Sequence, residues 1–353
     1  MFKINPLIDK PSGLIFYSLL TIVIAVNCIY VNTAEAQLEV NTIDVFIPSG
    51  SGGLNLPQGI ICDNNDNVYV TSELTNEVLR YNGTSGAFID AFVTSGSGGL
   101  ADGRGLEFGP DGNLYVVSAD SDEVLRYNGM TGNFIDAFVT AGSGGLDRPN
   151  GLTFGPDGNL YVSSFSQDRV LRYNGTTGIF LDVFVPSGSG GLDGANGLVF
   201  GTDGNLYVAS QNNNLVNRYD GMTGAFINTF VTMGSGGLDR PNGITFGPDS
   251  NFYVTSAGTD QVLRYNGDTG VFIDVFVPTG SAGLEEPRYL KFNRQNNLLV
   301  NSSTNDSVII AVTITAAPVP ALSEWGLITM VVLLGIVGFI VFARRQVVAE
   351  DKY

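Results

Sequence analysis

The chain has 353 residues, a formal net charge of −17 and no histidine. The lack of histidine excludes Ser-His and Cys-His nucleophile arrangements and removes the commonest metal ligand. Residues 37–320 contain 12 Lys and Arg against 29 Asp and Glu, so this part carries 12 − 29 = −17. That balance argues against nucleic acid and anionic lipid as partners.

The first 36 residues have the pattern of a signal peptide. Lys3 and Lys10 precede an apolar stretch, residues 14–31, and residues 34–36 read Ala-Glu-Ala, which fits an A-x-A cleavage site. We therefore expect cleavage after residue 36 and an exported protein. An uncleaved anchor and a lipoprotein attached at Cys28 are the alternatives.

Residues 43–314 repeat with a period of 46. Tyrosine keeps this interval at Tyr69, Tyr115, Tyr161, Tyr207 and Tyr253, and arginine keeps it at Arg80, Arg126, Arg172, Arg218 and Arg264. A fixed period of this length indicates one structural unit that is copied in tandem.

One unit contains four short β-type runs separated by turn residues. In the third unit we expect strands at 151–154, 159–164, 169–174 and 180–185. Asx-Gly sequences such as Asn174-Gly175 favour hairpin turns because these residues tolerate positive φ. Four antiparallel strands in a unit of this length are typical of a β-propeller blade.

The two ends of the repeat region complete one another. Five units have four strands, whereas the last unit, which starts at Tyr289, has only three. A lone strand of the fourth type, residues 43–47, precedes the first unit. We therefore expect an all-β, six-bladed β-propeller over residues 37–315, in which the N-terminal strand closes the last blade and removes exposed sheet edges.

The repeat motifs resemble those of the NHL repeat family. The match lies in Pro-Asn-Gly-Leu at 149–152, Asp-Gly-Asn-Leu-Tyr-Val at 157–162 and Asp-Arg-Val at 168–170, and it recurs in each unit. The resemblance implies a six-bladed propeller that acts as an interaction platform. Related propellers include lactonases and lyases, so the resemblance leaves the activity open.

The composition changes after residue 315. Residues 316–326 are expected to form a linker and a sorting motif, and the apolar run 327–343 is expected to form a transmembrane helix. Arg344 and Arg345 mark the cytoplasmic end of that helix, which leaves residues 344–353 as a cytoplasmic tail.

Residues 319–326 resemble the IPTL-CTERM sorting signal of Gram-negative bacteria. The matching residues are Pro320, Leu322, Trp325 and Gly326, followed by the apolar run and the two arginines. The resemblance implies recognition by an exosortase-type membrane protease and transfer to the cell surface. A plain C-terminal membrane anchor is the alternative.

Polar residues just before the first strand of each unit are expected to surround the mouth of the central channel. This ring consists of Gln58, Arg104, Asn150, Asn196, Asn242 and Arg288. Further along the same strands, Glu107 and Lys291 are expected to face the channel and could pair across it, and Phe165 is expected as an exposed aromatic in a neighbouring loop. These residues are the candidate site for a small polar ligand; ordinary solvation of a water-filled channel is the alternative.

A metal site like that of the gluconolactonase-type propellers is a further alternative. Those propellers hold a divalent metal with channel carboxylates and amides, but here Glu107 is the one carboxylate among the channel positions, beside three asparagines of the ring. We therefore expect no metal or cofactor and a non-catalytic scaffold, anchored at the envelope or surface, that binds a protein or glycan. A metal-dependent hydrolase or lyase and a structural component of an extracellular matrix remain as alternatives.

Two further patterns predict structural contacts. Arg172 and Asp182 should form a cross-strand ion pair, which recurs as Arg80/Asp90, Arg126/Asp136 and Arg264/Asp274, while Arg218 should face Asn228 and Ile310 should face Asp44. The loop between the second and third strands always ends in Asp or Asn, at Asn76, Asp122, Asp168, Asn214, Asp260 and Asp306. We expect these side chains to accept hydrogen bonds from loop backbone amides.

Overall fold

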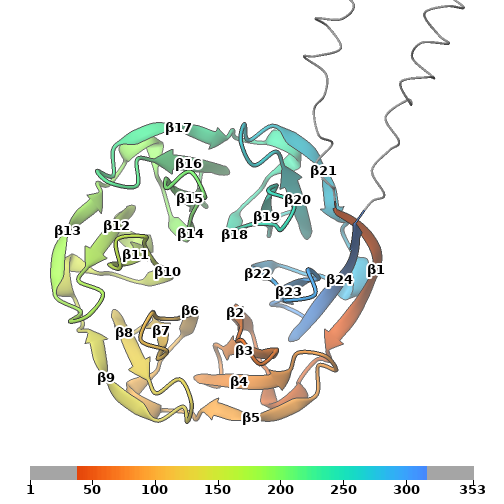
Figure 1. The fold of residues 1–353 in the computed structure, drawn as a ribbon, viewed down its shortest axis with the longest axis horizontal. Helices are drawn as coiled ribbons and strands as arrows, with labels where there is room; N and C mark the ends of the chain where they lie inside the picture. The colour runs from red at the N-terminus through yellow and green to blue at the C-terminus, as the bar shows by residue number, and fades with distance from the viewer. Residues whose placement is uncertain (1–37, 316–353) are drawn as a thin grey trace, which may run out of the picture. The chain divides into compact units, whose positions relative to one another are not determined.

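A computed structural model describes residues 38–315, which form a six-bladed β-propeller with the first strand of each blade nearest the central axis (Figure 1). Blade one contains β2 (Pro57–Cys62), β3 (Asn67–Ser72), β4 (Glu77–Asn82) and β5 (Phe88–Val93), and blade two contains β6 (Gly103–Phe108), β7 (Leu114–Ser118), β8 (Glu123–Tyr127) and β9 (Phe134–Val139). Blade three contains β10 (Pro149–Phe154), β11 (Leu160–Ser164), β12 (Arg169–Tyr173) and β13 (Phe180–Val185). Blade four contains β14 (Ala195–Phe200), β15 (Leu206–Ser210), β16 (Leu215–Tyr219) and β17 (Phe226–Val231). Blade five contains β18 (Pro241–Phe246), β19 (Phe252–Ser256), β20 (Gln261–Tyr265) and β21 (Phe272–Val277).

The sixth blade confirms the predicted closure. Its sheet has the order β1-β24-β23-β22, so strand β1 (Leu38–Ile47) completes a blade whose other strands are β22 (Pro287–Phe292), β23 (Leu298–Ser302) and β24 (Ser307–Thr315). Strand β1 begins at residue 38 rather than at the predicted residue 43. Leu38 is buried there, and its carbonyl oxygen accepts a hydrogen bond of 2.5 Å from the Arg264 guanidinium of blade five.

The predicted terminal segments lie outside the described residues. These are the signal peptide (1–36), the linker and sorting motif (316–326), the transmembrane helix (327–343) and the cytoplasmic tail (344–353). Within residues 38–315, no helix combines the length and the apolar character needed to cross a bilayer.

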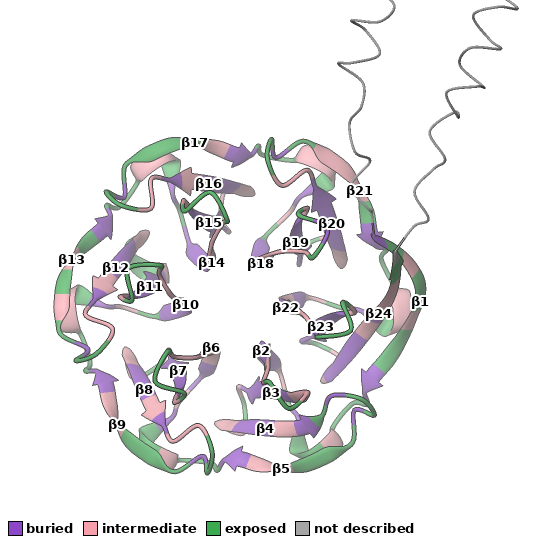
Figure 2. Cartoon of the chain, viewed as in Figure 1, coloured by how far each residue is buried: buried purple, intermediate pink, exposed green. Residues whose placement is uncertain are grey.

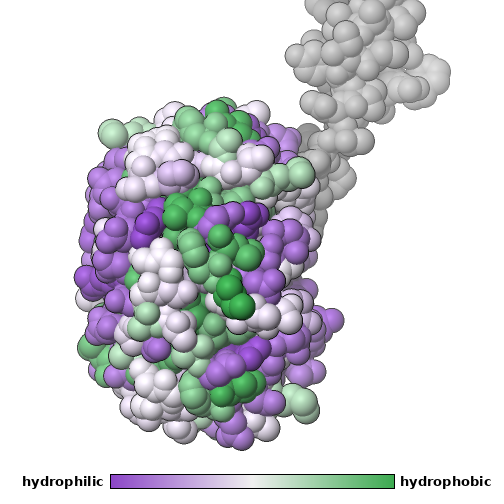
Figure 3. All heavy atoms as spheres, turned by 90° about the vertical axis from the view of Figure 1, so that its left-hand side faces the viewer, coloured by the Kyte–Doolittle hydropathy of each residue, from purple (hydrophilic) through white to green (hydrophobic). Residues whose placement is uncertain are grey.

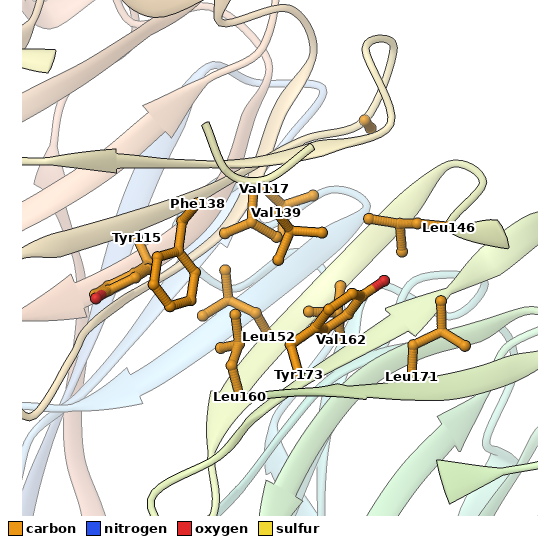
Figure 4. Packing of buried hydrophobic residues seen from close by; sticks show 12 residues of the cluster. Tyr115, Val117, Phe138, Val139, Leu146, Leu152, Leu160, Val162, Leu171 and Tyr173 are labelled. Atoms are coloured by element: carbon orange, nitrogen blue, oxygen red, sulfur yellow. The ribbon is translucent and has the colours of Figure 1, made fainter. Parts of the chain in front are cut away.

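The hydrophobic core lies between successive blades. In Figure 4, Tyr115 and Phe138 of blade two pack toward Leu152 and Leu160 of blade three, and all four belong to one buried cluster. The Tyr115 ring meets the Phe138 ring edge to face, with centroids 4.9 Å apart. Burial is therefore greatest on the inner strands and least on the outer ones (Figure 2), and the 46-residue spacing of the tyrosines reflects one such interface per blade.

The outer rim carries the predicted cross-strand ion pairs. Arg172 Nε and Nη2 donate to the two carboxylate oxygens of Asp182 at 3.1 and 2.5 Å, and the equivalent pair is present in blades one, two and five. Arg218 donates instead to Asn228 at 3.2 Å, as predicted. The side of the rim that holds β13 shows hydrophobic residues among hydrophilic ones (Figure 3), and Leu181 and Val183 of this strand are exposed. Strands β1 and β24 are neighbours, but whether Ile310 faces Asp44 stays a prediction.

Replacing Asp182 by Asn should lower the free energy of unfolding by less than about 1 kcal/mol. Asp182 is 45% exposed, and exposed ion pairs contribute little because water screens them. Blade four is a built-in control, since it already has asparagine in this place. Urea unfolding of the parent and of Asp182→Asn at low and high salt measures the difference; a loss above about 2 kcal/mol would contradict it.

The Asp or Asn residue at the end of each of these loops joins neighbouring blades. Asp168 has φ 53°, and its Oδ1 accepts a hydrogen bond of 2.7 Å from the backbone N–H of Gly194, in the connection that enters the next blade. The same contact occurs at Asn76, Asp122, Asn214 and Asp260, at 2.6–2.9 Å. At the closure, Asp306 accepts from Leu56 at 2.7 Å. The predicted hydrogen bond to a backbone amide is present, but it joins two blades instead of capping its own loop.

Replacing Asp168 by Ala should destabilise the propeller by about 1–3 kcal/mol, because the Gly194 N–H loses its partner and alanine disfavours positive φ. Asp168→Asn should be nearly neutral, since asparagine makes the same contact at Asn76 and Asn214. Chemical unfolding of the two variants separates loss of the acceptor from loss of the charge. Equal destabilisation by both substitutions would contradict the hydrogen-bond explanation.

Candidate functional site

The six polar ring residues lie together at one mouth of the channel. They line a cavity of about 240 Å³, which we call the cup, together with Arg148, Phe165, Gln211 and Tyr289. Each ring residue lies in the first strand of its blade, at a shift in strand register; in blade three the shift falls between Pro149 and Leu152 and contains Asn150. A bulge of this kind re-aims side chains, so the same local irregularity places all six around the axis.

Hydrogen bonds between neighbouring blades fix the wall of the cup. Arg104 Nη1 donates to Asn150 Oδ1 at 2.9 Å, and Asn196 Nδ2 donates to Asn242 Oδ1 at 2.7 Å. The loop residue Gln211 also accepts from Asn196, at 3.1 Å. The three asparagines are almost fully buried, so the wall is held in place before any ligand arrives.

Phe165 lies at the rim of the cup, in the short 3-10 turn η4 (Phe165–Gln167) between β11 and β12. Its side chain is half-buried rather than freely exposed. It therefore presents an aromatic surface to the cavity, in place of the outward-facing contact that the loop sequence suggested.

Tyr289 closes the cup from below, and sequence reasoning missed it. The equivalent residue in the other five blades is glycine: Gly59, Gly105, Gly151, Gly197 and Gly243. The Tyr289 hydroxyl lies 3.5 Å from Asn196 Oδ1, and a Cβ built on Gly151 would lie 2.9 Å from it. Because Gly151 belongs to the blade opposite blade six, the tyrosine side chain spans the channel. The signal was available, since the 46-residue alignment shows one tyrosine among glycines.

Glu107 and Lys291 do not line the cup. Glu107 lies two residues further along its strand than Gly105, about 6–7 Å deeper in the channel than the level of Tyr289. Among the described residues, no ion pair within 4.0 Å joins Glu107 to Lys291. The structure thus divides the sequence-predicted site into a mouth and a deeper level.

The environment of Glu107 disfavours its charged form. Burial raises the pKa of Glu107 to about 7, although the Lys291 charge and a hydrogen bond with Thr153 act in the opposite direction. Glu107 as a whole residue is half-buried. It is therefore a proton-binding group near neutral pH, separated from the cup by Tyr289.

The two arginines of the ring differ in how their charges are compensated. Burial lowers the pKa of Arg104, but two hydrogen bonds to Asp102, at 2.9 and 2.7 Å, and the charges of Asp102 and Glu73 together outweigh this effect, so the pKa of Arg104 is raised. Arg288 has one contact of 3.4 Å to Glu286, and its Nε is buried without a partner among residues 38–315. Burial lowers the pKa of Arg288, and the Arg104 and Arg240 charges lower it further.

The donor groups of the cup do not suit a divalent cation. Amide oxygens are available on the asparagines, but the arginine side chains beside them would repel a metal ion, and hard cations prefer several carboxylate oxygens. In the described part of the chain, no group of three or more His, Cys, Asp or Glu residues is placed to hold a metal.

One family model matches the chain. The IPTL-CTERM motif matches residues 317–346, which include the predicted sorting residues Pro320, Leu322, Trp325 and Gly326 and the basic pair Arg344 and Arg345. This match indicates an exported protein associated with the cell envelope and is consistent with an exosortase-type sorting system. No match was found among curated proteins.

Several solved structures share the propeller fold at low sequence identity. An auxiliary nutrient binding protein from Bacteroides ovatus has 13% identity and a TM-score of 0.61, over 79% of this chain and 78% of that one. A gluconolactonase from Xanthomonas campestris has 14% identity and a TM-score of 0.60, over 77% and 89%. Virginiamycin B lyase from Staphylococcus aureus has 14% identity and a TM-score of 0.57, over 78% and 99%. The fold is that of a six-bladed propeller, and the C-terminal motif suggests that the protein is exported and associated with the cell envelope.

Proposed function

We propose that this protein is a non-catalytic binding propeller, exported by a Gram-negative bacterium, whose cup takes a small polar group of a glycan or protein partner. The observation that carries this proposal is the cup itself, in which amides, arginines and two aromatic rings surround one cavity and hydrogen bonds hold part of its wall. Ligand sites in proteins are typically preformed cavities in which a few polar groups fix orientation. The binding role named for the Bacteroides ovatus neighbour is in keeping with it.

The C-terminal motif supports a cellular location for this binding function. We infer that residues 327–343 hold the protein in the inner membrane at least transiently, and that an exosortase-type protease then transfers it to the surface. The propeller would face away from the cytoplasm, because Arg344 and Arg345 follow the apolar run. NHL-type repeats, which the blades resemble, would supply the scaffold.

A glycan and peptide array probed with the purified full-length chain in mild detergent tests the binding function. Phe165→Ala should weaken any bound probe several-fold, because it removes an aromatic wall of the cup. Leu74→Ala is the matched control: Leu74 lies in the equivalent loop of blade one, is 62% exposed and does not line the cup. Binding that Leu74→Ala and Phe165→Ala change equally, or no binding at all, would contradict the proposal.

A metal-dependent hydrolase or lyase is the second candidate. The fold it shares with a gluconolactonase and a lyase, and the raised pKa of Glu107, favour it. The cup's donor groups argue against a metal there. Thermal unfolding with Ca²⁺, Mg²⁺ and Zn²⁺, together with a lactone hydrolysis assay, tests this candidate: stabilisation by one ion and turnover with it would favour the enzyme.

A structural role in an extracellular matrix is the third candidate. Near-identical blades suit it, since a building block needs no asymmetric site. It predicts self-association that does not change when Phe165 is replaced.

A further inference from the structure

The positive charges of this acidic propeller gather at the cup. Of the 12 Lys and Arg in residues 37–320, five are the arginines of the outer rim of the propeller, which repeat every 46 residues from Arg80 to Arg264. Three of the other seven, Arg104, Arg148 and Arg288, line the cup, and Arg240 is joined to it through Glu286, at 3.2 Å. A local cluster of cations on a chain with net charge −17 indicates a ligand that carries negative charge.

The carboxylates near the cup do not neutralise this cluster evenly. Asp102 is engaged by Arg104 through two hydrogen bonds, and Glu286 is shared between Arg240 and Arg288 at 3.2 and 3.4 Å. Glu73, which accepts a hydrogen bond of 2.5 Å from Gln58, interacts electrostatically with both Arg104 and Arg288. Arg288 therefore shares Glu286 and Glu73 with other arginines, and its buried Nε has no partner among the described residues. The guanidinium of an arginine in this state can donate two parallel hydrogen bonds to a carboxylate.

The remaining lining suits a sugar ring. Asn196 uses both of its amide N–H groups on Gln211 and Asn242, but Asn150, Asn242 and Gln58 keep N–H groups for the hydroxyl oxygens of a ligand. Phe165 and Tyr289 offer aromatic surface. Among residues 38–315, the Tyr289 hydroxyl makes one hydrogen-bond contact, the long one of 3.5 Å to Asn196, which a ligand acceptor can replace. A cavity of about 240 Å³ lies below the usual range for drug-sized ligands, which limits the occupant to about one ring.

We propose that the cup binds the carboxylate of an acidic sugar, a single hexuronate unit, with Arg288 as the main carboxylate contact and Tyr289 as the floor beneath the ring. This inference rests on the proposed binding function and names its ligand class. The acidic body disfavours long polyanions, but its field is screened beyond about 8–10 Å at physiological salt, so a single uronate at the mouth senses mainly the arginines.

Calorimetric titration of the full-length chain with D-glucuronate, D-glucose and acetate tests the ligand class. D-glucuronate should bind at least tenfold more tightly than either of the others, and raising the salt concentration should weaken it. A glucuronate-terminated disaccharide separates a glycan end from the free sugar: equal or tighter binding of the disaccharide identifies a chain end as the ligand, and its exclusion identifies the free acid. Equal affinity for D-glucuronate and D-glucose would overturn the inference.

Variants locate the carboxylate contact. Arg288→Gln should weaken D-glucuronate tenfold or more and leave D-glucose unchanged, whereas Arg294→Gln, at a 59% exposed side chain outside the cup, should change neither. The Arg288→Gln melting temperature should equal or exceed the parent's, because the substitution removes an under-compensated buried charge. Unchanged glucuronate affinity in Arg288→Gln overturns the inference. If the cup binds a neutral sugar and Phe165→Ala abolishes that binding, the proposed binding function stands but the acidic ligand is wrong. If no probe binds, both proposals are wrong.

Discussion

Deleting strand β1 should abolish the cooperative unfolding transition of the propeller. The deletion removes residues 38–47 from the full chain and leaves β24 as an unpaired edge. It also removes Phe46 and Ile47, which are buried in the core between blades six and one. Large-to-small changes at such positions cost about 2–5 kcal/mol each, so the summed loss is comparable with a typical total stability of about 5–15 kcal/mol. Urea unfolding followed by circular dichroism would show a broad, early transition or aggregation.

Two substitutions on the same strand separate the loss of core packing from the effect of changing any residue of β1. Ile47→Ala should lower the free energy of unfolding by about 2–4 kcal/mol, because Ile47 is completely buried. Val45→Ala should change it by less than about 0.5 kcal/mol, because Val45 is 49% exposed. A deletion variant that keeps the parent's unfolding midpoint would show that β1 is not required for ring closure.

The fold could be predicted from the sequence because each blade repeats the same pattern of turns and buried apolar positions. Turn residues, alternating apolar positions and the 46-residue period agree, so the number of blades followed from the two incomplete ends. The errors lie where the repeat is broken or irregular. The first strand of blade three starts at Pro149 rather than residue 151, because pairing of Pro149 with Ser164 resumes beyond the bulge. Strand β1 extends to Leu38 through a contact with Arg264, for which no other blade provides a copy.

The candidate site was only partly predictable. The polar ring could be predicted because its members share one position in the repeat, but depth within the channel cannot be derived from a period. Glu107 and Lys291 were therefore grouped with the mouth, although they lie below the level of Tyr289. Tyr289 itself was treated as the start of a strand, where tyrosine is common, and not as a side chain that crosses the channel. The hydrogen bond between Asp168 and Gly194 joins residues 26 apart, a relation that no local pattern reveals.

The free energy of unfolding should fall as the pH rises through about 7, and Glu107→Gln should remove much of this dependence. The pKa of Glu107 is raised from 4.5 to about 7 because burial disfavours the carboxylate. A group whose pKa is higher in the folded state stabilises that state below its unfolded pKa, and the stabilisation is lost as the pH passes the folded pKa. The parent should therefore be as stable as Glu107→Gln at pH 4.5 and less stable by about 1–3 kcal/mol at pH 8.

Lys291 provides an internal check on the cause. Its charge lowers the pKa of Glu107, so Lys291→Gln should raise that pKa further and widen the stability gap between pH 4.5 and pH 8. The double variant with Glu107→Gln should show no widened gap, because the titrating group is gone. Glu39→Gln, an exposed carboxyl on β1, serves as the control and should shift the unfolding curves equally little at both pH values. If the free energy of unfolding of Glu107→Gln depends on pH between 4.5 and 8 in the same way as that of the parent, channel water solvates the carboxylate well enough to cancel the effect of burial. Glu107 would then have no role as a proton-binding group near neutral pH, and the enzyme alternative would lose the main feature of this chain that favours it.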